Sequence, residues 1–176
     1  HGVKQIVVCL GNDVLHTEDG KGTTKGTPQD VTGTWYHAFR LAKFLYISMI
    51  EELALHADVL LVHVTDNHAG YSSYGLSEAV AARFYNHPNV TSVITERHRK
   101  YVVFGQNLIM FTHGDGAKLA DLPLIMASDV PGDWAAATWR VWHCGHFHHD
   151  QLKDHPGCTV ETHRTLAAND AWHRHQ

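Results

Sequence analysis

Four short polar loops, each directly after an apolar stretch, carry the side chains of this chain that are best suited to chemistry. The loops are Gly11-Asn12-Asp13, Asp66-Asn67-His68-Ala69, Thr112-His113-Gly114-Asp115 and Gly145-His146-Phe147-His148. The apolar stretches before them, residues 6–10, 59–62, 108–111 and 139–142, indicate buried strands. Because the carboxyl ends of strands gather sites at one edge of an α/β sheet, we expect the four loops to meet there.

The donor types in these loops fit a metal site. A carboxylate, a carboxamide and several imidazoles without a thiolate suit Mn²⁺, Fe²⁺ or Zn²⁺ better than a structural zinc site built from cysteines. A carboxylate such as Asp13 can bridge two ions, and neutral ligands leave positive charge that suits a phosphate. Two such ions can hold a phosphoryl group and activate a water for in-line displacement.

In this order the loops resemble those of the calcineurin-like metallophosphoesterase superfamily, which read Asp-x-His, Gly-Asp, Gly-Asn-His-Asp/Glu, an isolated His and Gly-His-x-His. All but the first are visible between Gly11 and His148. Within the superfamily, residues 11–16, 22–30 and 169–173 are similar to phage-type proteins described as DNA-repair exonucleases. The resemblance implies a fold of the α/β class, a four-layer α/β/β/α sandwich.

The resemblance also implies a role for individual residues. The implied metal ligands are Asp13, Asn67, His113, His146 and His148. Asp13 would bridge two divalent ions, manganese ahead of zinc or iron, and His148 would serve the ion that the other three do not. His68 would stay off the metals and contact the scissile phosphate or protonate the leaving group, which is typically worth about 10²–10⁴ in rate.

The chain departs from the superfamily pattern at two places. No Asp-x-His precedes Asp13, so the chain looks like a fragment without its first strand, and we expect the ion served by His148 to be absent, partly occupied or rescued by a neighbour such as His16. Asp66 and Ala69 replace the usual Gly and acidic residue around Asn67-His68. We therefore expect a different loop backbone and a His68 that lacks its usual orienting partner.

Composition agrees with one domain over residues 1–176, since 176 residues with 44% apolar side chains can bury a real core. The 14 basic and 18 acidic residues give a net charge of -4, which excludes a broad basic nucleic-acid surface, so any DNA contact should be local and centred on the metals. Three unclustered cysteines, Cys9, Cys144 and Cys158, indicate reduced intracellular thiols. With no signal peptide or membrane-length apolar segment, we expect a cytoplasmic protein, in a host cell if the source is a virus.

Periodicity predicts the elements that carry the loops. A helix is expected at residues 34–57, with a core stripe of Trp35, Phe39, Ala42, Tyr46, Met49 and Leu53. Strands are expected at residues 3–10, 58–64, 90–96, 100–104, 107–113, 139–144 and 159–166, and shorter helices at residues 76–86 and 133–137. Gly105-Gln106 is the expected hairpin turn, and the long loop at residues 11–33 is expected to be functional or mobile.

Simpler interpretations stay open for each candidate. Asp13 and Asn67 are common turn residues, and His148 fits a solvated turn. His16, Thr24 and Lys25 offer donors for phosphate or sugar contacts, but they also fit a solvated loop. The predicted function is metal-dependent hydrolysis of phosphoesters, by a phosphodiesterase or nuclease acting on DNA; the alternatives are a phosphomonoesterase and a metal-binding or nucleic-acid-binding module that has lost turnover.

Overall fold

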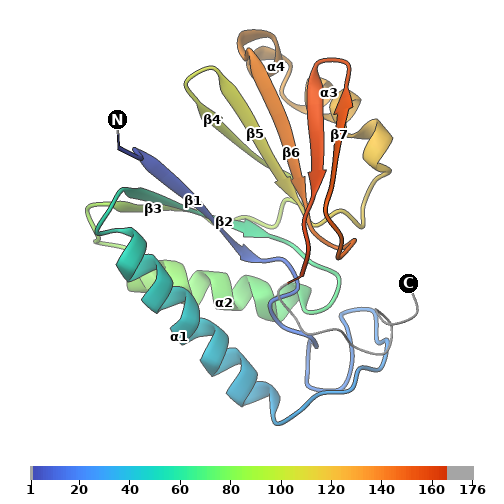
Figure 1. Cartoon of the computed structure of the whole chain (residues 1–176). Helices are drawn as coiled ribbons and strands as arrows, with labels where there is room; N and C mark the ends of the chain where they lie inside the picture. Colours follow the sequence, from blue (N-terminus) through green and yellow to red (C-terminus); the bar gives the residue numbers. More distant parts are fainter. Residues whose placement is uncertain (1, 166–176) are drawn as a thin grey trace.

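Two β-sheets form the centre of the structure, a computed structural model that describes residues 2–165 (Figure 1). The first sheet is parallel, with the order β1 (Gln5–Gly11), β2 (Asp58–Val64) and β3 (Val90–Val93). The second sheet is mixed, with the order β4 (Lys100–Phe104), β5 (Asn107–Thr112), β6 (Trp139–Cys144), β8 (Cys158–Thr162) and β7 (Gln151–His155). The similarity that involves residues 169–173, and the last residue of the strand expected at 159–166, lie outside the described residues.

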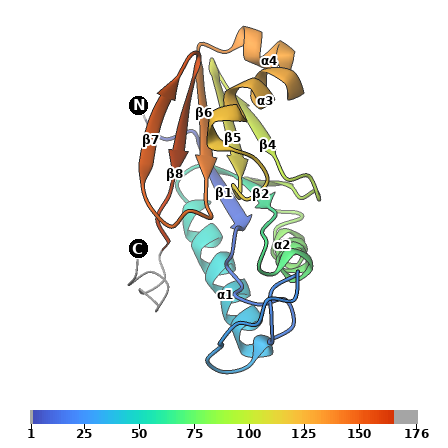
Figure 2. The ribbon, with the colours of Figure 1, turned by 90° about the vertical axis from the view of Figure 1, so that its right-hand side faces the viewer.

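Helices cover one face of each sheet. Helices α1 (Trp35–Leu53) and α2 (Gly70–Arg83) lie along the first sheet, while the short helix η1 (Leu119–Asp121), α3 (Leu122–Asp129) and α4 (Pro131–Ala136) lie along the second (Figures 1 and 2). The predicted α/β class, with two sheets and helices outside them, is confirmed. None of the described helices combines the length and apolar character that a membrane span needs.

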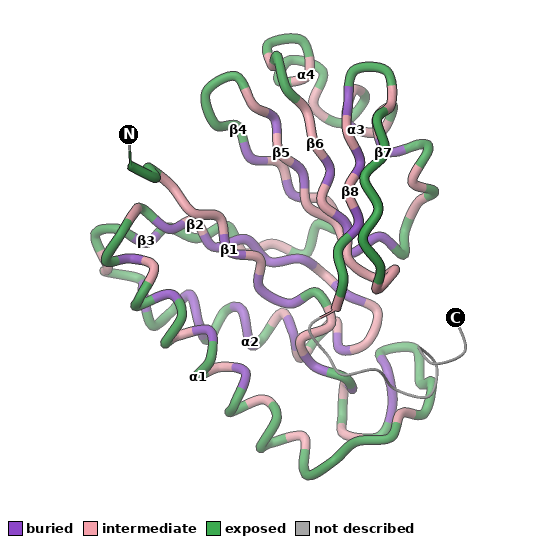
Figure 3. Tube along the Cα trace, viewed as in Figure 1, coloured by how far each residue is buried: buried purple, intermediate pink, exposed green. Residues whose placement is uncertain are grey.

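Each sheet has its own apolar core, and the buried segments follow β1, β2 and the central strands of the second sheet (Figure 3). In the first core, Leu10 and Leu61 pack with side chains of α1 and α2 such as Ile50. In the second, Trp142 is fully buried and its indole N–H donates to the Leu122 carbonyl oxygen at 3.0 Å. Two separate cores leave the strand ends of both sheets free to build a site.

The stripe predicted for α1 is right except at one position. Thr34 caps the helix by accepting the His37 N–H, and Ala42 and Tyr46 are buried as expected. Met49 is 37% exposed, and Ile50 takes the core position instead. Steps of four residues advance around the helix by about 40° each, so along residues 42, 46 and 50 the buried face moves to one side of Ala42, and Met49 falls on the opposite side of that residue.

Helix α2 begins at Gly70, six residues before the predicted start at residue 76, and ends at Arg83. Gly70, Ser72, Ser73 and Gly75 are weak helix formers, so local propensity gives no signal there. Side chains from elsewhere bind the N–H groups that a helix start leaves free: Asp66 binds the Ala69 N–H, Thr24 binds Gly70, and Glu18 binds Tyr71 and Ser72. Contacts distant in sequence therefore define where this helix starts.

Strand β7 was not predicted, and four predicted strands are shorter than expected, among them β5, which ends at Thr112 instead of residue 113. Four of the five β7 residues are exposed and the strand lies at the edge of the sheet, paired with β8, so it has no alternation of apolar and polar residues to reveal it. Strand β3 ends at Val93 instead of residue 96, and β8 ends at Thr162. Strand β1 begins at Gln5 instead of residue 3.

The loops of interest lie at matching strand ends. Gly11 at the end of β1 pairs with Val64 at the end of β2, and Thr112 of β5 pairs with Cys144 of β6. Both pairs of strands are parallel, so the four loops that follow leave their sheets at carboxyl ends. Figure 1 shows these ends of the two sheets converging, which brings the loops together.

Candidate metal centre

His113, at the end of β5, is the centre of the converging loops and is only 1% exposed. Its Nδ1 lies 2.8 Å from Asn12 Oδ1 and its Nε2 lies 2.7 Å from Asn67 Oδ1, and because both amide oxygens can only accept, a ring with one proton can donate to one of them alone. A ring that donates its Nδ1–H to Asn12 keeps the Nε2 lone pair for a metal ion. Burial, followed by the charge of His146, lowers the pKa of His113 to about 4, so the ring is neutral at pH 7.

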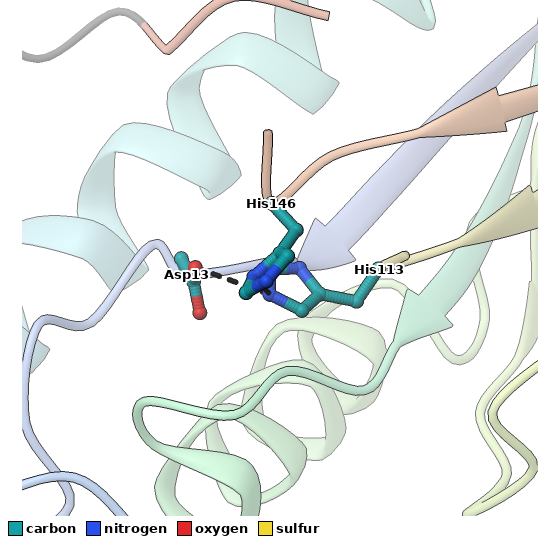
Figure 4. A group of neighbouring side chains, drawn as sticks. All are labelled: Asp13, His113 and His146. Carbon is teal, nitrogen blue, oxygen red and sulfur yellow. Dashed lines mark hydrogen bonds and ion pairs between the residues drawn. The ribbon is translucent and has the colours of Figure 1, made fainter. Parts of the chain in front are cut away.

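Three further donor atoms lie around His113 Nε2. Asn67 Oδ1 is 2.7 Å away, and Asp13 Oδ2 and His146 Nδ1 are each 3.2 Å away. The ligand atoms of Asp13, His113 and His146 all lie within 4.8 Å of one another (Figure 4). An amide oxygen, a carboxylate oxygen and two imidazole nitrogens therefore point at one small volume.

The surroundings of Asp13 also indicate a cation beside His113. Its Oδ1 is buried and has no hydrogen-bond partner among the described residues. Burial raises the pKa of Asp13 to about 7, although the nearby His68 lowers it in part. A buried carboxylate without compensation costs free energy, and a divalent ion with two to four protein donors is the group that would compensate it. The donor set fits Mn²⁺, Fe²⁺ or Zn²⁺.

The backbone around these donors has an unusual conformation. Among the described residues, the non-glycine residues with positive φ are Asn12 (55°), Asp13 (63°), His146 (63°) and His148 (57°). Such backbone is costly and persists where the surrounding structure holds it, often at functional sites. Gly145 allows the Asn12 side chain to approach the backbone closely, because a Cβ there would lie 2.5 Å from Asn12 Oδ1.

His148 stands apart from the other predicted ligands. It is close enough to His113 for its charge to contribute to the lowered pKa of that residue, after burial and nearer groups. It is not part of the group formed by Asp13, His113 and His146. The structure thus brings together Asp13, Asn67, His113 and His146, while the role of His148 in a second ion site stays a prediction.

His68 lies beside the donor group with its ring held in place. Its Nδ1 donates to the carbonyl oxygen of His16 at 3.1 Å, and the two rings lie 5.3 Å apart between centroids. Its charge and its backbone N–H each lower the pKa of Asp13 in part. With Ala69 in place of the expected acidic partner, the His16 carbonyl oxygen orients the His68 ring instead.

The loop before α2 owes its shape to Asp66. One carboxylate oxygen accepts the Ala69 N–H at 2.8 Å, and the other accepts the Ser73 hydroxyl at 2.6 Å. These bonds fold residues 66–69 into a turn that holds Asn67 toward His113. The Asp66 side chain thus shapes this turn, while a backbone different from that of the superfamily loop stays a prediction.

Thr24 and Lys25 line a cavity of about 470 Å³ that also borders Asn67, Tyr71, Tyr74 and His98. The Thr24 hydroxyl accepts the Gly70 N–H at 2.8 Å and donates to Glu18 at 3.1 Å, so it fastens the long loop to α2. The loop also closes on itself, with Thr23 N–H donating to the Thr27 carbonyl oxygen. His16 lines a different cavity, beside Trp35.

Two residues of this centre were missed in the sequence. Asn12 orients His113, but the two are 101 residues apart and no local pattern links them. Asp66 was treated as a departure from a motif, although Asp side chains often accept backbone N–H groups a few residues on, as Asp66 does from Ala69, and this could have indicated its role.

Comparison with known proteins adds little to this description. No family model matches the chain, and no curated protein matches it either. Among solved structures, it is similar to a conserved uncharacterized protein from Streptococcus pneumoniae TIGR4, described as a predicted phosphoesterase. The identity is 15%, the TM-score is 0.37, and the match covers 71% of this chain and 67% of that one. Function is therefore inferred from the site itself.

Proposed function

We propose that this chain is a metal-dependent phosphoesterase, acting on phosphodiesters through the centre at Asp13, Asn67, His113 and His146. One observation carries the proposal: Asn67 Oδ1, Asp13 Oδ2 and His146 Nδ1 all lie 2.7–3.2 Å from His113 Nε2, while Asp13 Oδ1 is buried without a hydrogen-bond partner among the described residues. The order of the loops along the chain, which resembles that of metallophosphoesterases, supports the same assignment.

The chemistry follows from the kinds of groups present. A divalent cation held there would attract a phosphoryl oxygen and ease the deprotonation of water. His68 is placed to hold or deliver a proton: its Nδ1–H is engaged by the His16 carbonyl, which leaves Nε2 as the atom that can face a leaving oxygen. His68 is thus the proposed general acid, as the resemblance implies.

The proposed substrate is a phosphodiester, with DNA as the candidate polymer. The support is the cavity that borders Asn67, which offers the Lys25 ammonium for a phosphate and the rings of Tyr71 and Tyr74 for a base or sugar. A net charge of -4 favours such local contacts over a broad electrostatic surface. We keep Thr24 as a weaker contact because its hydroxyl already holds α2, and His16 because its carbonyl holds His68.

A metal-binding module with little turnover is the second candidate. It is favoured by the ligand count, since Asp13 and His148 are the only predicted ligands for the second ion in the described part of the chain. For the phosphoesterase we also propose manganese as the metal, nuclease activity on DNA, and a cytoplasmic location, in a host cell if the source is a virus.

The test measures metal binding and hydrolysis together. Protein stripped with a chelator is titrated with Mn²⁺ and assayed on bis(nitrophenyl) phosphate, nitrophenyl phosphate and single-stranded DNA. We expect Mn²⁺-dependent cleavage of the diesters, lost together with the bound ion in His113→Asn. His56→Asn is the matched control, because His56 is an exposed histidine paired only with Glu52. Metal binding at Asp13 without turnover would support the binding module, and unchanged binding in His113→Asn would refute both candidates.

A further inference from the structure

A second group of side chains that could bind a metal lies near the carboxyl ends of β6 and β8, in the sheet that also carries His113. In register, Phe111 of β5 lies next to His143 of β6, and His143 lies next to Glu161 of β8. Their neighbours Trp142, Cys144 and Val160 are buried in the core with α3. Because side chains alternate along a strand, His143 and Glu161 share the face that points away from α3 and α4.

His163 joins this pair from the residues that follow β8. Its N–H donates to the Cys144 carbonyl oxygen at 2.9 Å, which continues the pairing of β8 with β6 by one step. Its Nε2 lies 2.9 Å from His143 Nδ1, and the two rings stack with centroids 5.1 Å apart. The backbone bond thus places the third side chain on the same face.

The distances match those of a small coordination shell. The carboxylate atom Glu161 Oε2 lies 3.4 Å from His143 Nδ1, and the ligand atoms of the three residues all lie within 4.8 Å of one another. In a tetrahedral site with bonds of about 2.0–2.1 Å, two ligand atoms are about 3.4 Å apart. An outward shift of about half an ångström between the two ring nitrogens is enough to admit an ion.

Neighbouring side chains hold His143, Glu161 and His163 in place, and solvent can still reach them. Phe111 stacks on the His143 ring, with centroids 5.5 Å apart and planes at 22°. The side chains of His143, Glu161 and His163 are 28%, 34% and 46% exposed, so water can complete a coordination shell. Burial, followed by the charge of His163, lowers the pKa of His143, which favours the neutral form of the ring.

We propose that His143, Glu161 and His163 bind one divalent cation of the Zn²⁺ type, at a site that shares no ligand with the centre at His113. Two imidazoles with one carboxylate form a donor set that suits Zn²⁺ and its neighbours in the transition series. The site ties β6 and β8 to the chain that leaves β8. It is independent of the proposed phosphoesterase activity, because it uses other residues on another part of the sheet.

The competing description is a proton-linked network without metal. In that case His143 Nδ1–H donates to His163 Nε2, and Glu161 accepts from neither ring at a good hydrogen-bond distance, since its second contact, to His163 Nδ1, is 3.9 Å. A network of this kind needs one shared proton, whereas a cation uses all three lone pairs. Metal binding separates the two descriptions.

The experiment counts Zn²⁺ ions bound by chelator-treated full-length chain and follows Co²⁺ binding by its visible absorption. Wild type, His163→Asn, Glu161→Gln and the control His56→Asn are compared, with His113→Asn to remove the other centre. We expect His113→Asn to retain one ion, and His163→Asn and Glu161→Gln to lose that ion. Their affinity should fall by at least the factor of about 10–100 that loss of a supporting partner costs.

The two substitutions distinguish the metal site from the proton network. His163 is 46% exposed, so its substitution should leave the fold intact, and Glu161→Gln keeps the shape of the side chain. If both variants bind Zn²⁺ with the stoichiometry and affinity of wild type, in the presence and absence of His113→Asn, the site does not exist and the proton network describes the cluster. Loss of the ion in the two variants but not in His56→Asn establishes the site.

Discussion

Asp66 and Asp13 lie at the ends of neighbouring parallel strands, yet their carboxylates have opposite surroundings. Both oxygens of Asp66 accept hydrogen bonds, from the Ala69 N–H at 2.8 Å and the Ser73 hydroxyl at 2.6 Å. Asp13 has one buried oxygen without a hydrogen-bond partner among the described residues, and its other oxygen lies 3.2 Å from His113 Nε2. The first carboxylate serves the fold, whereas the second is complete only when something else binds.

Lys100 and His113, two buried side chains with nitrogen atoms, differ in a similar way. The Lys100 ammonium is buried, and it donates to the Thr95 carbonyl, the Thr95 hydroxyl and the Arg97 carbonyl at 2.6–2.7 Å. The neutral His113 ring has one N–H for the four polar atoms that surround its two nitrogens. In these two comparisons, the groups that the chain itself satisfies serve the structure, and the groups that it leaves incompletely satisfied belong to the candidate site. The following substitutions test this distinction.

The largest effect is expected on turnover at His68. In protein loaded with Mn²⁺, His68→Ala should leave the bound ion nearly unchanged but lower cleavage of DNA by about 10²–10⁴. The reason is that the ring lies beside the donor group without being part of it, and an alkoxide leaving group needs a proton. Steady-state kinetics and metal content are measured on the same samples.

The leaving group supplies the control for His68. Nitrophenolate leaves without much help from an acid, so the His68→Ala defect should shrink sharply on bis(nitrophenyl) phosphate. An equal loss on both substrates would mean that His68 stabilises charge on the phosphoryl oxygens. No loss on either would remove His68 from catalysis.

Next in size is the loss of stability in Asp66→Ala. Two hydrogen bonds to a charged group disappear, each worth about 1.5–3 kcal/mol, so unfolding free energy should fall by about 3–5 kcal/mol. Urea unfolding measures this, with Asp66→Asn as the control because the amide oxygen keeps one acceptor. A stability near that of wild type in Asp66→Ala would show that the turn does not depend on this carboxylate.

Strands with clear apolar patterns could be predicted from the sequence. The bounds predicted for β2, β4 and β6 are the observed ones, because each is a short run of β-formers between turn residues. The hairpin turn at Gly105-Gln106 is also confirmed, with Gly105 at a φ of 59°. Local chemistry is sufficient for such elements.

Features that depend on distant partners could not be predicted. The start of α2 depends on Glu18 and Thr24, which lie on another loop, and the orientation of His113 depends on Asn12. The order of the polar loops along the chain indicated which side chains to examine. It contained no information on which carboxylate, Asp13 or Asp66, would be left without partners.

His63 has one ring nitrogen with a hydrogen-bond partner and one without, and we expect it to make the stability of the fold depend on pH. Its Nδ1 is paired with the Ser77 hydroxyl at 2.9 Å, while its Nε2 is buried without a partner among the described residues. Burial, assisted by the charge of Lys100, lowers the pKa of His63 to about 4, against about 6.5 in an unfolded chain. Between these values only the unfolded chain takes up the proton, so stability present above about pH 6.5 is lost as the pH falls toward 4.

The expected size of that loss is up to about 3 kcal/mol, from a pKa difference of about 2.5. Urea unfolding of wild type and His63→Gln at about pH 7.5 and about pH 5 isolates it, because the other histidines contribute equally to both proteins. Glutamine keeps an N–H for Ser77 but does not titrate. The wild type should lose more stability than the variant on acidification; parallel losses would show that His63 is protonated in the folded state.

The smallest effect, and the one with the opposite sign, is expected for Asp13→Asn in metal-free protein. The substitution replaces a carboxylate whose Oδ1 is buried without a hydrogen-bond partner among the described residues, and it adds N–H donors for His113 Nε2, which lies 3.2 Å from the present oxygen. Unfolding free energy should therefore rise by about 0.5–2 kcal/mol, the range typical of relieving a site that is shaped for function.

In Mn²⁺ wild type should be more stable than Asp13→Asn, because wild type gains stability from the bound ion and the variant does not. Thermal unfolding with and without Mn²⁺ measures both signs, with Asp66→Asn as the matched control, for which no metal dependence is expected. If Asp13→Asn destabilises the metal-free protein as Asp66→Asn does, the two carboxylates have the same structural role and the contrast between them is wrong.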